Sequence, residues 1–174
     1  MPSLQHSIDI LQNLVGHPSV SSTSNTAVSE AAAEVLAEFG FEVDQTTYVD
    51  PHGVTKMNLV AQRQPAATGS TEAGGLAYFC HTDVVPADDW TGPGGDPFQG
   101  VVQNDRIYGR GSCDMKGSLV AMLSAAARAS RQEQRAPLWI VCTADEEVGF
   151  LGAKDLVKNS AAYRNIVESQ PLAI

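Results

Sequence analysis

Basic residues are scarce in this sequence. It has 11 Lys and Arg against 20 Asp and Glu, which gives a net charge of -9 over 174 residues. Proteins that bind a phosphate backbone usually display a basic face, so this balance argues against a nucleic-acid partner. It fits a chain whose acidic side chains partly serve to bind cations.

Long apolar runs are also missing. No stretch approaches the roughly 18 apolar residues that a membrane-spanning helix needs, and Met1–His6 has no basic segment followed by an apolar one. We therefore expect no membrane partner, no secretory signal and a cytoplasmic location. The composition, 43% hydrophobic and 18% charged, is that of a soluble globular protein, and the length fits one ordinary domain.

Cysteine is the third scarce residue. Cys80, Cys113 and Cys142 are odd in number and include no CxxC pair, which argues against a disulfide framework. Each lies near an acidic or histidine cluster. We expect reduced thiols that fill small core positions at strand ends, and not metal ligands.

What the sequence does contain is an alternation of helical and extended patterns, without internal repeats. Helical spacing of apolar residues predicts helices over 4–15, 28–39, 115–130 and 149–159. Apolar or alternating runs predict strands over 41–49, 56–63, 76–81 and 138–143, a hairpin turning at 104–105 and a strand beginning at 171–174. The segments 64–75 and 86–100 are rich in Pro and Gly and are expected to be loops. This order predicts an α/β layer fold with a mainly parallel sheet.

Candidate functional residues follow two of the predicted strands. His81 and Asp83 end one apolar strand, the acidic run 145–147 follows another, and Asp114 precedes the helix between them. In α/β folds of this kind, chemistry gathers at the carboxyl ends of the strands. The coincidence predicts one site that contains all three groups.

Each group also has an ordinary structural explanation. His81 and Asp83 point to the same side of a strand, so the carboxylate can orient the ring as a metal ligand, or both can simply cap the strand end. Asp114 stands among three glycines and can bridge two cations or N-cap the next helix. The acidic run 145–147 needs compensating cations or protons, or it is a solvated helix start.

The joint pattern resembles a known family. His-Thr-Asp-Val-Val-Pro (81–86), Gly-Arg-Gly-Ser-Cys-Asp-Met-Lys-Gly (109–117) and Thr-Ala-Asp-Glu-Glu-Val-Gly (143–149) resemble the three signature motifs of the acetylornithine deacetylase/succinyl-diaminopimelate desuccinylase family. Its members are dinuclear zinc amidases and exopeptidases. The resemblance implies a three-layer α/β sandwich that binds two Zn²⁺, with Co²⁺ as an alternative. The implied substrate is a small N-acyl amino acid or a short peptide.

The resemblance also implies a role for each candidate residue. It assigns His81 to one metal with Asp83 orienting it, Asp114 to a bridge between both metals, Glu146 to the general base and Glu147 to the second metal. It further implies a cis peptide bond between Asp114 and Met115.

Residues 1–174 match only the N-terminal segment of the family's catalytic domain, so we expect its lid or dimerisation domain and its C-terminal catalytic segment to be absent. One further acidic ligand is expected just beyond residue 174, with Glu168 as the alternative within the chain. An incomplete sheet is expected to expose apolar surface and to favour a homodimer or other self-association. Three functions stay open: an amidohydrolase, a metallo-exopeptidase, and a metal-binding fragment without turnover.

Overall fold

A five-stranded sheet forms the centre of the protein, which a computed structural model describes over residues 3–66, 74–129 and 134–174. In spatial order the strands are β1 (Glu42–Val49), β2 (Thr55–Arg63), β6 (Leu138–Thr143), β3 (Leu76–His81) and β7 (Leu172–Ala173). Strand β2 pairs antiparallel with β1 and β6, whereas β3 pairs parallel with β6 and β7. All strands except β2 therefore run in one direction, and the predicted mainly parallel sheet is confirmed.

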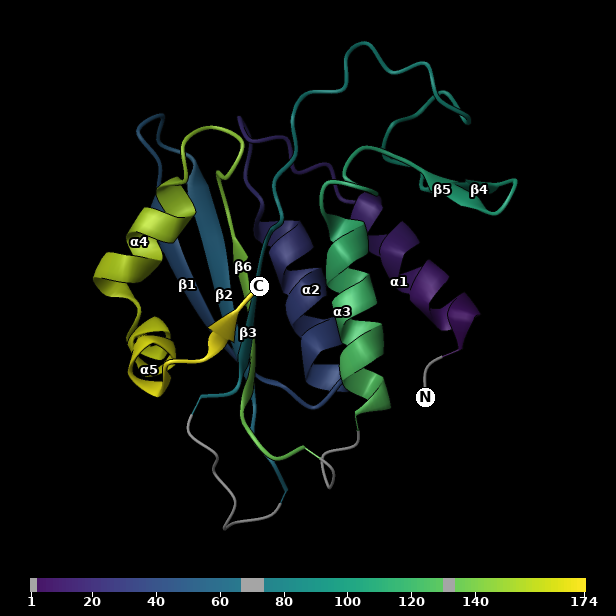
Figure 1. Cartoon of the computed structure of the whole chain (residues 1–174). Coiled ribbons are helices and arrows are strands. Elements are labelled where there is room, and N and C mark those ends of the chain that lie inside the picture. Colours follow the sequence, from purple (N-terminus) through teal and green to yellow (C-terminus); the bar gives the residue numbers. More distant parts are fainter. Residues whose placement is uncertain (1–2, 67–73, 130–133) are drawn as a thin grey trace.

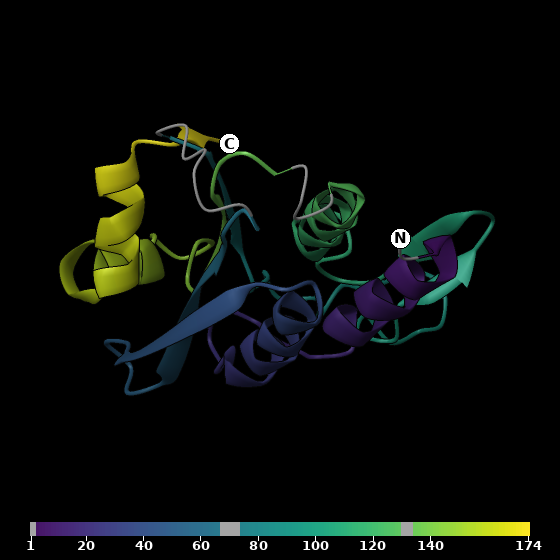
Figure 2. The ribbon, with the colours of Figure 1, turned by 90° about the horizontal axis from the view of Figure 1, so that it is seen from below.

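Helices cover both faces of this sheet, which makes the three-layer sandwich that the resemblance implies (Figures 1 and 2). One face carries α1 (Leu4–Val15), α2 (Thr26–Glu38) and α3 (Lys116–Arg128), and the other carries α4 (Leu151–Asn159) and α5 (Ala161–Ser169). A separate hairpin, β4 (Val101–Gln103) with β5 (Arg106–Tyr108), lies beside α1. It turns at Asn104 and Asp105, as predicted, and both residues have the positive φ of a type I′ turn.

Strand β6 shows how one short sequence organises both layers. All six of its residues are buried. Leu138, Ile140 and Cys142 belong to the larger core under α1–α3, while Trp139 and Val141 belong to the smaller core under α4 and α5. Successive side chains on a strand point to opposite faces, so an unbroken apolar run can fill two cores at once.

Two expected elements differ from the structure. Helix α5 was not predicted, because a single residue separates it from α4. Ser160 ends α4 and caps α5, its hydroxyl accepting the N–H of Tyr163 at 3.0 Å. The helix expected from 149 begins at Leu151, since Gly149 and Phe150 have positive φ values. Ser130 and the 67–73 part of the expected loop 64–75 lie outside the described residues.

The three thiols do not share one environment. Cys80 and Cys142 are buried at directly paired positions of β3 and β6, with their sulfur atoms 3.4 Å apart. Cys113 is exposed, so the expectation of three buried thiols is wrong at that position. It lies in the turn before α3 that presents Asp114 to solvent, and not on a strand.

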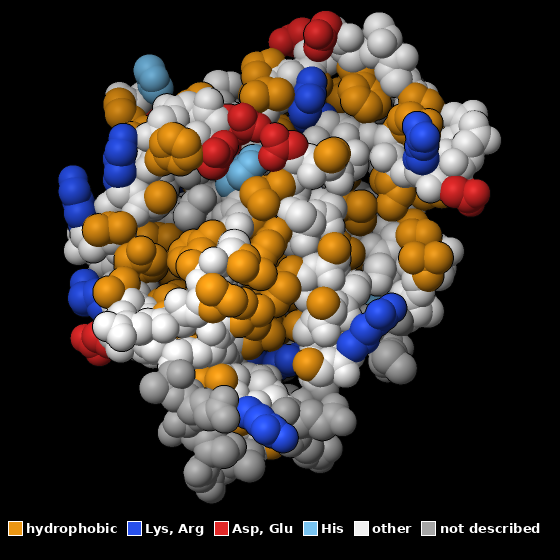
Figure 3. All heavy atoms as spheres, viewed as in Figure 1, with side chains coloured by type: hydrophobic (Ala, Val, Ile, Leu, Met, Phe, Trp, Pro, Cys, Tyr) orange, Lys and Arg blue, Asp and Glu red, His pale blue; other side chains and the backbone are white. Residues whose placement is uncertain are grey.

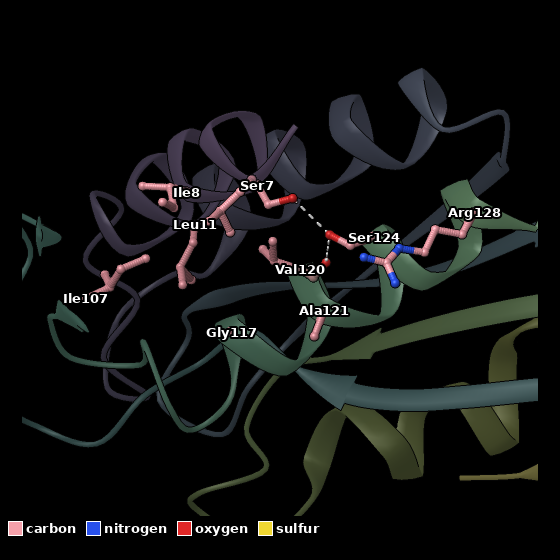
Figure 4. A pocket seen from close by; sticks show the side chains of 10 residues that line it. Ser7, Ile8, Leu11, Ile107, Gly117, Val120, Ala121, Ser124 and Arg128 are labelled. Carbon is pink, nitrogen blue, oxygen red and sulfur yellow. Dashed lines mark hydrogen bonds between the residues drawn. The ribbon is translucent and has the colours of Figure 1, made fainter. Parts of the chain in front are cut away.

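Apolar side chains are exposed on the β7 edge of the sheet, at Leu172 and Ile174. Figure 3 shows hydrophobic side chains gathered on this face of the molecule. Among the described helices, none is both long and apolar enough to cross a membrane.

Candidate metal centre

The predicted site residues come together at one edge of the sheet. His81 is the last residue of β3 and pairs in parallel register with Thr143, the last residue of β6. The acidic run 145–147 therefore leaves the sheet beside His81, and Asp114 enters from the loop before α3. Figure 3 shows acidic side chains gathered beside a histidine on one face of the molecule.

The distances within the group suit a cation. The Nε2 atom of His81 lies 3.1 Å from Oδ1 of Asp114 and 3.9 Å from Oε2 of Glu146. His81, Glu146 and Glu147 each offer one ligand atom, and these atoms lie within 4.8 Å of one another. One imidazole nitrogen with several carboxylate oxygens is a donor set that zinc accepts. The residues present therefore fit a metal ion.

Burial differs sharply across the group. The side chain of His81 is 5% exposed, whereas those of Glu146 and Asp114 are 37% and 76% exposed. The histidine is held within the protein at the end of β3, and the carboxylates face solvent. A cation and a substrate can both reach such a site without opening the fold.

Two of the glycines around Asp114 are sterically required. Gly111 has a φ of +81°, and a Cβ there would lie 2.7 Å from Cγ1 of Val84. A Cβ on Gly117 would collide with the carbonyl oxygen of Ser112. The Asp114–Met115 peptide bond is cis, which confirms the bond that the resemblance implies.

Asp83 orients His81 through a different atom from the one expected. Nδ1 of His81 donates to the main-chain carbonyl of Asp83 at 2.9 Å, while the nearest carboxylate oxygen lies 3.6 Å away. The effect on the ring is the same. With its proton held at Nδ1, a neutral imidazole would offer the Nε2 lone pair to a cation bound among the carboxylates.

The Asp83 carboxylate instead holds the acidic turn. It accepts the Ser21 hydroxyl at 2.7 Å and the main-chain N–H groups of Glu146 at 3.1 Å and Glu147 at 3.4 Å. Burial raises the pKa of this carboxyl, but the nearby His81 and the hydrogen bonds from Ser21 and the Glu146 N–H outweigh burial and leave the pKa below its usual value. Asp83 therefore stays ionised and binds β3 to the turn after β6.

Charges within the group oppose one another in the absence of a metal. Burial lowers the pKa of His81, but the contacts with Asp83 and Asp114 have a larger, opposite effect and raise the pKa to about 9. The pKa of Glu147 is raised by burial and by the neighbouring Asp114 and Glu146 carboxylates, against the opposing effect of His81. At neutral pH the imidazole thus carries a proton at the position where it would bind a metal.

Asp145 differs from the two acids that follow it. The sequence predicts one acidic cluster at 145–147, but the Asp145 side chain is 1% exposed and points inward. Its Oδ1 lies 2.8 Å from Nζ of Lys56, and its Oδ2 accepts the Tyr48 hydroxyl at 2.7 Å. The only signal in the sequence for these partners is a lysine within an apolar, buried strand.

Glu168, the alternative acidic ligand, lies at the wrong end of the sheet. It belongs to α5 and precedes β7, which pairs with Leu76 and Ala77 at the beginning of β3. His81 stands at the opposite end of that strand, about 16 Å away at 3.3 Å per residue. Glu168 is therefore not a ligand of this group.

A three-layer α/β sandwich with histidine and carboxylates gathered beyond its parallel strands defines a metallohydrolase type of domain. The chain belongs to peptidase family M20/M25/M40, whose model matches residues 77–172. The resemblance inferred from the three motifs is thereby confirmed.

Individual relatives agree with this assignment. The chain is 38% identical over 149 residues to an acetylornithine deacetylase of Myxococcus xanthus, covering 85% of this chain and 37% of that protein. It is 34% identical over 140 residues to a succinyl-diaminopimelate desuccinylase of Ehrlichia ruminantium, covering 80% of this chain and 35% of the relative. The chain thus spans less than two fifths of the length of either relative.

Solved structures support the fold. Human carnosine dipeptidase 1 superposes with a TM-score of 0.69 at 22% identity, covering 88% of this chain and 34% of that one. The M20 family metallo-carboxypeptidase Sso-CP2 from Sulfolobus solfataricus gives 0.67 at 25% identity, with 87% and 33% covered.

Proposed function

We propose that this chain forms the N-terminal part of a metal-dependent hydrolase that cleaves the amide bond of an N-acyl amino acid, as an acetylornithine deacetylase does. The observation that carries the proposal is the convergence of His81, Asp114, Glu146 and Glu147 at one open edge of the sheet. Relatives named for deacylation of amino acids support this substrate class.

The residues divide into metal ligands and proton carriers. His81, Glu147 and a bridging Asp114 would hold two Zn²⁺, for which Co²⁺ can substitute, and Asp83 would orient His81. Bound there, the ions would lower the pKa of water and polarise the amide carbonyl.

Glu146 is assigned as the general base. Its side chain is 37% exposed and faces the open side of the group, with Oε2 within 3.9 Å of the His81 ring. A carboxylate in this position takes one proton from the attacking water and returns it to the leaving nitrogen as the C–N bond breaks. The products are a carboxylate and a free amine.

Hydrolysis of N-acetylated amino acids with added Zn²⁺ or Co²⁺ tests this function, on the 174-residue chain and on any longer product of its reading frame. In an active form, Glu146→Gln is expected to lower kcat by about 10²–10⁴-fold. Glu30→Gln, on the exposed surface of α2, is the matched control and should leave kcat unchanged. Full activity of the Glu146 variant would contradict the assignment.

Two results would redirect the proposal. Cleavage of dipeptides without cleavage of N-acetyl amino acids would favour the exopeptidase, which the names of several structural neighbours suggest. Zinc binding with no turnover by any form of the protein would favour a metal-binding fragment. Light scattering of the same samples reads out the expected self-association.

A further inference from the structure

Beneath the exposed carboxylates lies a buried lysine with three acceptors. Lys56 of β2 is completely buried, and its ammonium group contacts the carbonyl oxygens of Ser21 at 2.6 Å and Thr23 at 2.7 Å. The third contact is the Oδ1 atom of Asp145 at 2.8 Å. Two N–H groups of the ammonium donate to the carbonyl oxygens, and its charge is matched by Asp145 and, at 3.9 Å, by Oδ2 of Asp50. Lys56 thereby joins the loop after α1 to the acidic turn.

These contacts close into a ring. Lys56 holds the Ser21 carbonyl, and the Ser21 hydroxyl donates to Asp83 at 2.7 Å. Asp83 in turn accepts the main-chain N–H groups of Glu146 and Glu147. Because Asp145 directly precedes Glu146 and pairs with Lys56, the ring returns to its starting point. Each connection is a hydrogen bond or ion pair to a charged group, the stronger kind in proteins.

Asp145 is the point at which this ring meets the candidate metal ligands. Its backbone has a φ of +57°, a left-handed conformation that a non-glycine residue keeps only where its surroundings hold it. Lys56 holds one carboxylate oxygen and Tyr48 holds the other. Burial and the bond to Asp145 raise the pKa of Tyr48 far above its usual value, so its hydroxyl remains a donor.

We propose that Lys56 and Asp145 are positioning residues for the metal centre, because their buried ion pair turns Asp145 inward and thereby directs Glu146 and Glu147 towards His81. This inference rests on the proposed function, but it assigns a role to residues that touch neither metal nor substrate. Neighbouring side chains diverge in direction along a turn. Fixing the first acid inward therefore determines where the next two point.

The positioning role differs from simple stabilisation in what it predicts. Residues that orient metal ligands typically change metal affinity by about 10–100-fold when they are replaced. Loss of stability alone lowers the population of folded protein but leaves the affinity of the folded form unchanged. Metal affinity and the geometry of the bound ion therefore distinguish the two roles.

The test is zinc affinity, measured by competition with a chromophoric chelator, together with the visible absorption of bound Co²⁺. Asp145→Asn is expected to weaken zinc binding about 10–100-fold and to alter the Co²⁺ spectrum. Tyr48→Phe removes one of the two bonds to Asp145 and should give a smaller change in the same direction. Ser160→Ala, which removes the α5 cap at the C-terminal end of α4, the end away from the acidic turn, should lower Tm without changing affinity or spectrum.

A double variant separates the two roles further. Lys56→Met with Asp145→Asn removes both charges of this ion pair, so it should recover stability relative to Asp145→Asn alone. We expect zinc affinity to stay weak, since the ion pair that turns residue 145 inward is then absent. Recovery of wild-type affinity in the double variant would overturn the positioning role.

The outcomes remain distinguishable from those of the proposed function. Wild-type affinity and an unchanged Co²⁺ spectrum in folded Asp145→Asn would overturn the inference and leave the metal centre in place. If that variant does not fold, the result for Tyr48→Phe decides in the same way. Failure of the unaltered chain to bind zinc would overturn the proposed metal centre and, with it, the positioning role.

Discussion

The site has an inner and an outer half that handle charge in opposite ways. In the inner half, Lys56, Asp83 and Asp145 are almost fully buried, and each is matched by opposite charge or by several donors. In the outer half, Asp114 is largely exposed and Glu146 is partly exposed, and among the described residues both lie within 4 Å of one basic side chain, that of His81. The charges of the inner half are paired within the protein. The negative charges of the outer half are compensated only when cations bind.

This contrast separates what stabilises the fold from what performs chemistry. A paired buried charge is strongly destabilising when its partner is removed. Crowded carboxylates at the surface have the reverse effect, since they repel one another until a cation binds. The following substitutions test whether the two halves differ in this way, with the free energy of unfolding of the metal-free protein as the common measure.

The largest effect is expected at Lys56. Lys56→Met leaves Asp145 buried without its cation, and we expect a loss of about 3–5 kcal/mol in urea unfolding with EDTA present. Lys154→Met is the matched control, because that lysine is exposed and should cost no more than about 0.5 kcal/mol. Equal losses in the two variants would remove the distinction between the halves.

A pH effect of intermediate size is expected at His81, where the halves meet. Its pKa of about 9 in the folded, metal-free protein lies above the ordinary histidine value of 6.5. Its protonation therefore stabilises the fold fully below pH 6.5, and this contribution is lost as pH rises through 9. Because Asp114 is 76% exposed and screened, we expect about 2 kcal/mol and not the full value of the shift.

Urea titrations in EDTA between pH 6 and pH 10 measure this loss. Repeating them on His81→Gln should remove most of the slope over that interval. A slope that survives the substitution would place the titration elsewhere.

A smaller loss is expected at Ser21. Ser21→Ala removes the hydroxyl that donates to the Asp83 carboxylate at 2.7 Å, and we expect a cost of about 1.5 kcal/mol, because the main-chain donors remain. Ser22→Ala is the neighbouring control, since Ser22 is exposed. Chemical unfolding of both variants measures the difference, and indistinguishable midpoints would argue against the hydrogen bond.

The smallest effect should have the opposite sign. Glu147→Gln relieves repulsion among the outer carboxylates, and we expect the metal-free protein to gain up to about 0.5 kcal/mol. With zinc present the same variant should lose the stabilisation that the metal provides to the unaltered protein. Thermal unfolding with and without zinc gives both results, and a metal-free loss would show that Glu147 already has a favourable partner.

The outer half was largely accessible to sequence reasoning, and the inner half was not. Strand 76–81 and strand 138–143 have the predicted bounds because their apolar runs end abruptly at polar motifs. His81, Asp114, Glu146 and Glu147 stand inside those motifs, so their convergence follows once the strands are parallel neighbours.

The partners in the inner half come from distant parts of the chain. Tyr48 and Asp145 are 97 residues apart in the sequence. Lys56, on β2, contacts Asp145 in the turn after the neighbouring strand β6. Charged residues are mostly exposed, so a lysine in a strand is expected to face solvent. Only the three-dimensional arrangement shows that this lysine is buried against two carbonyl oxygens and the Asp145 carboxylate.

The unequal environments of the cysteines supply a chemical gauge of folding. Cys113 is open to a water-borne thiol reagent, whereas Cys80 and Cys142 face each other inside the sheet. A native sample should titrate with one fast-reacting thiol per chain and a denatured one with three. Counting reactive thiols therefore monitors the integrity of the β3–β6 pair, and so of the site at its end, without any metal or substrate.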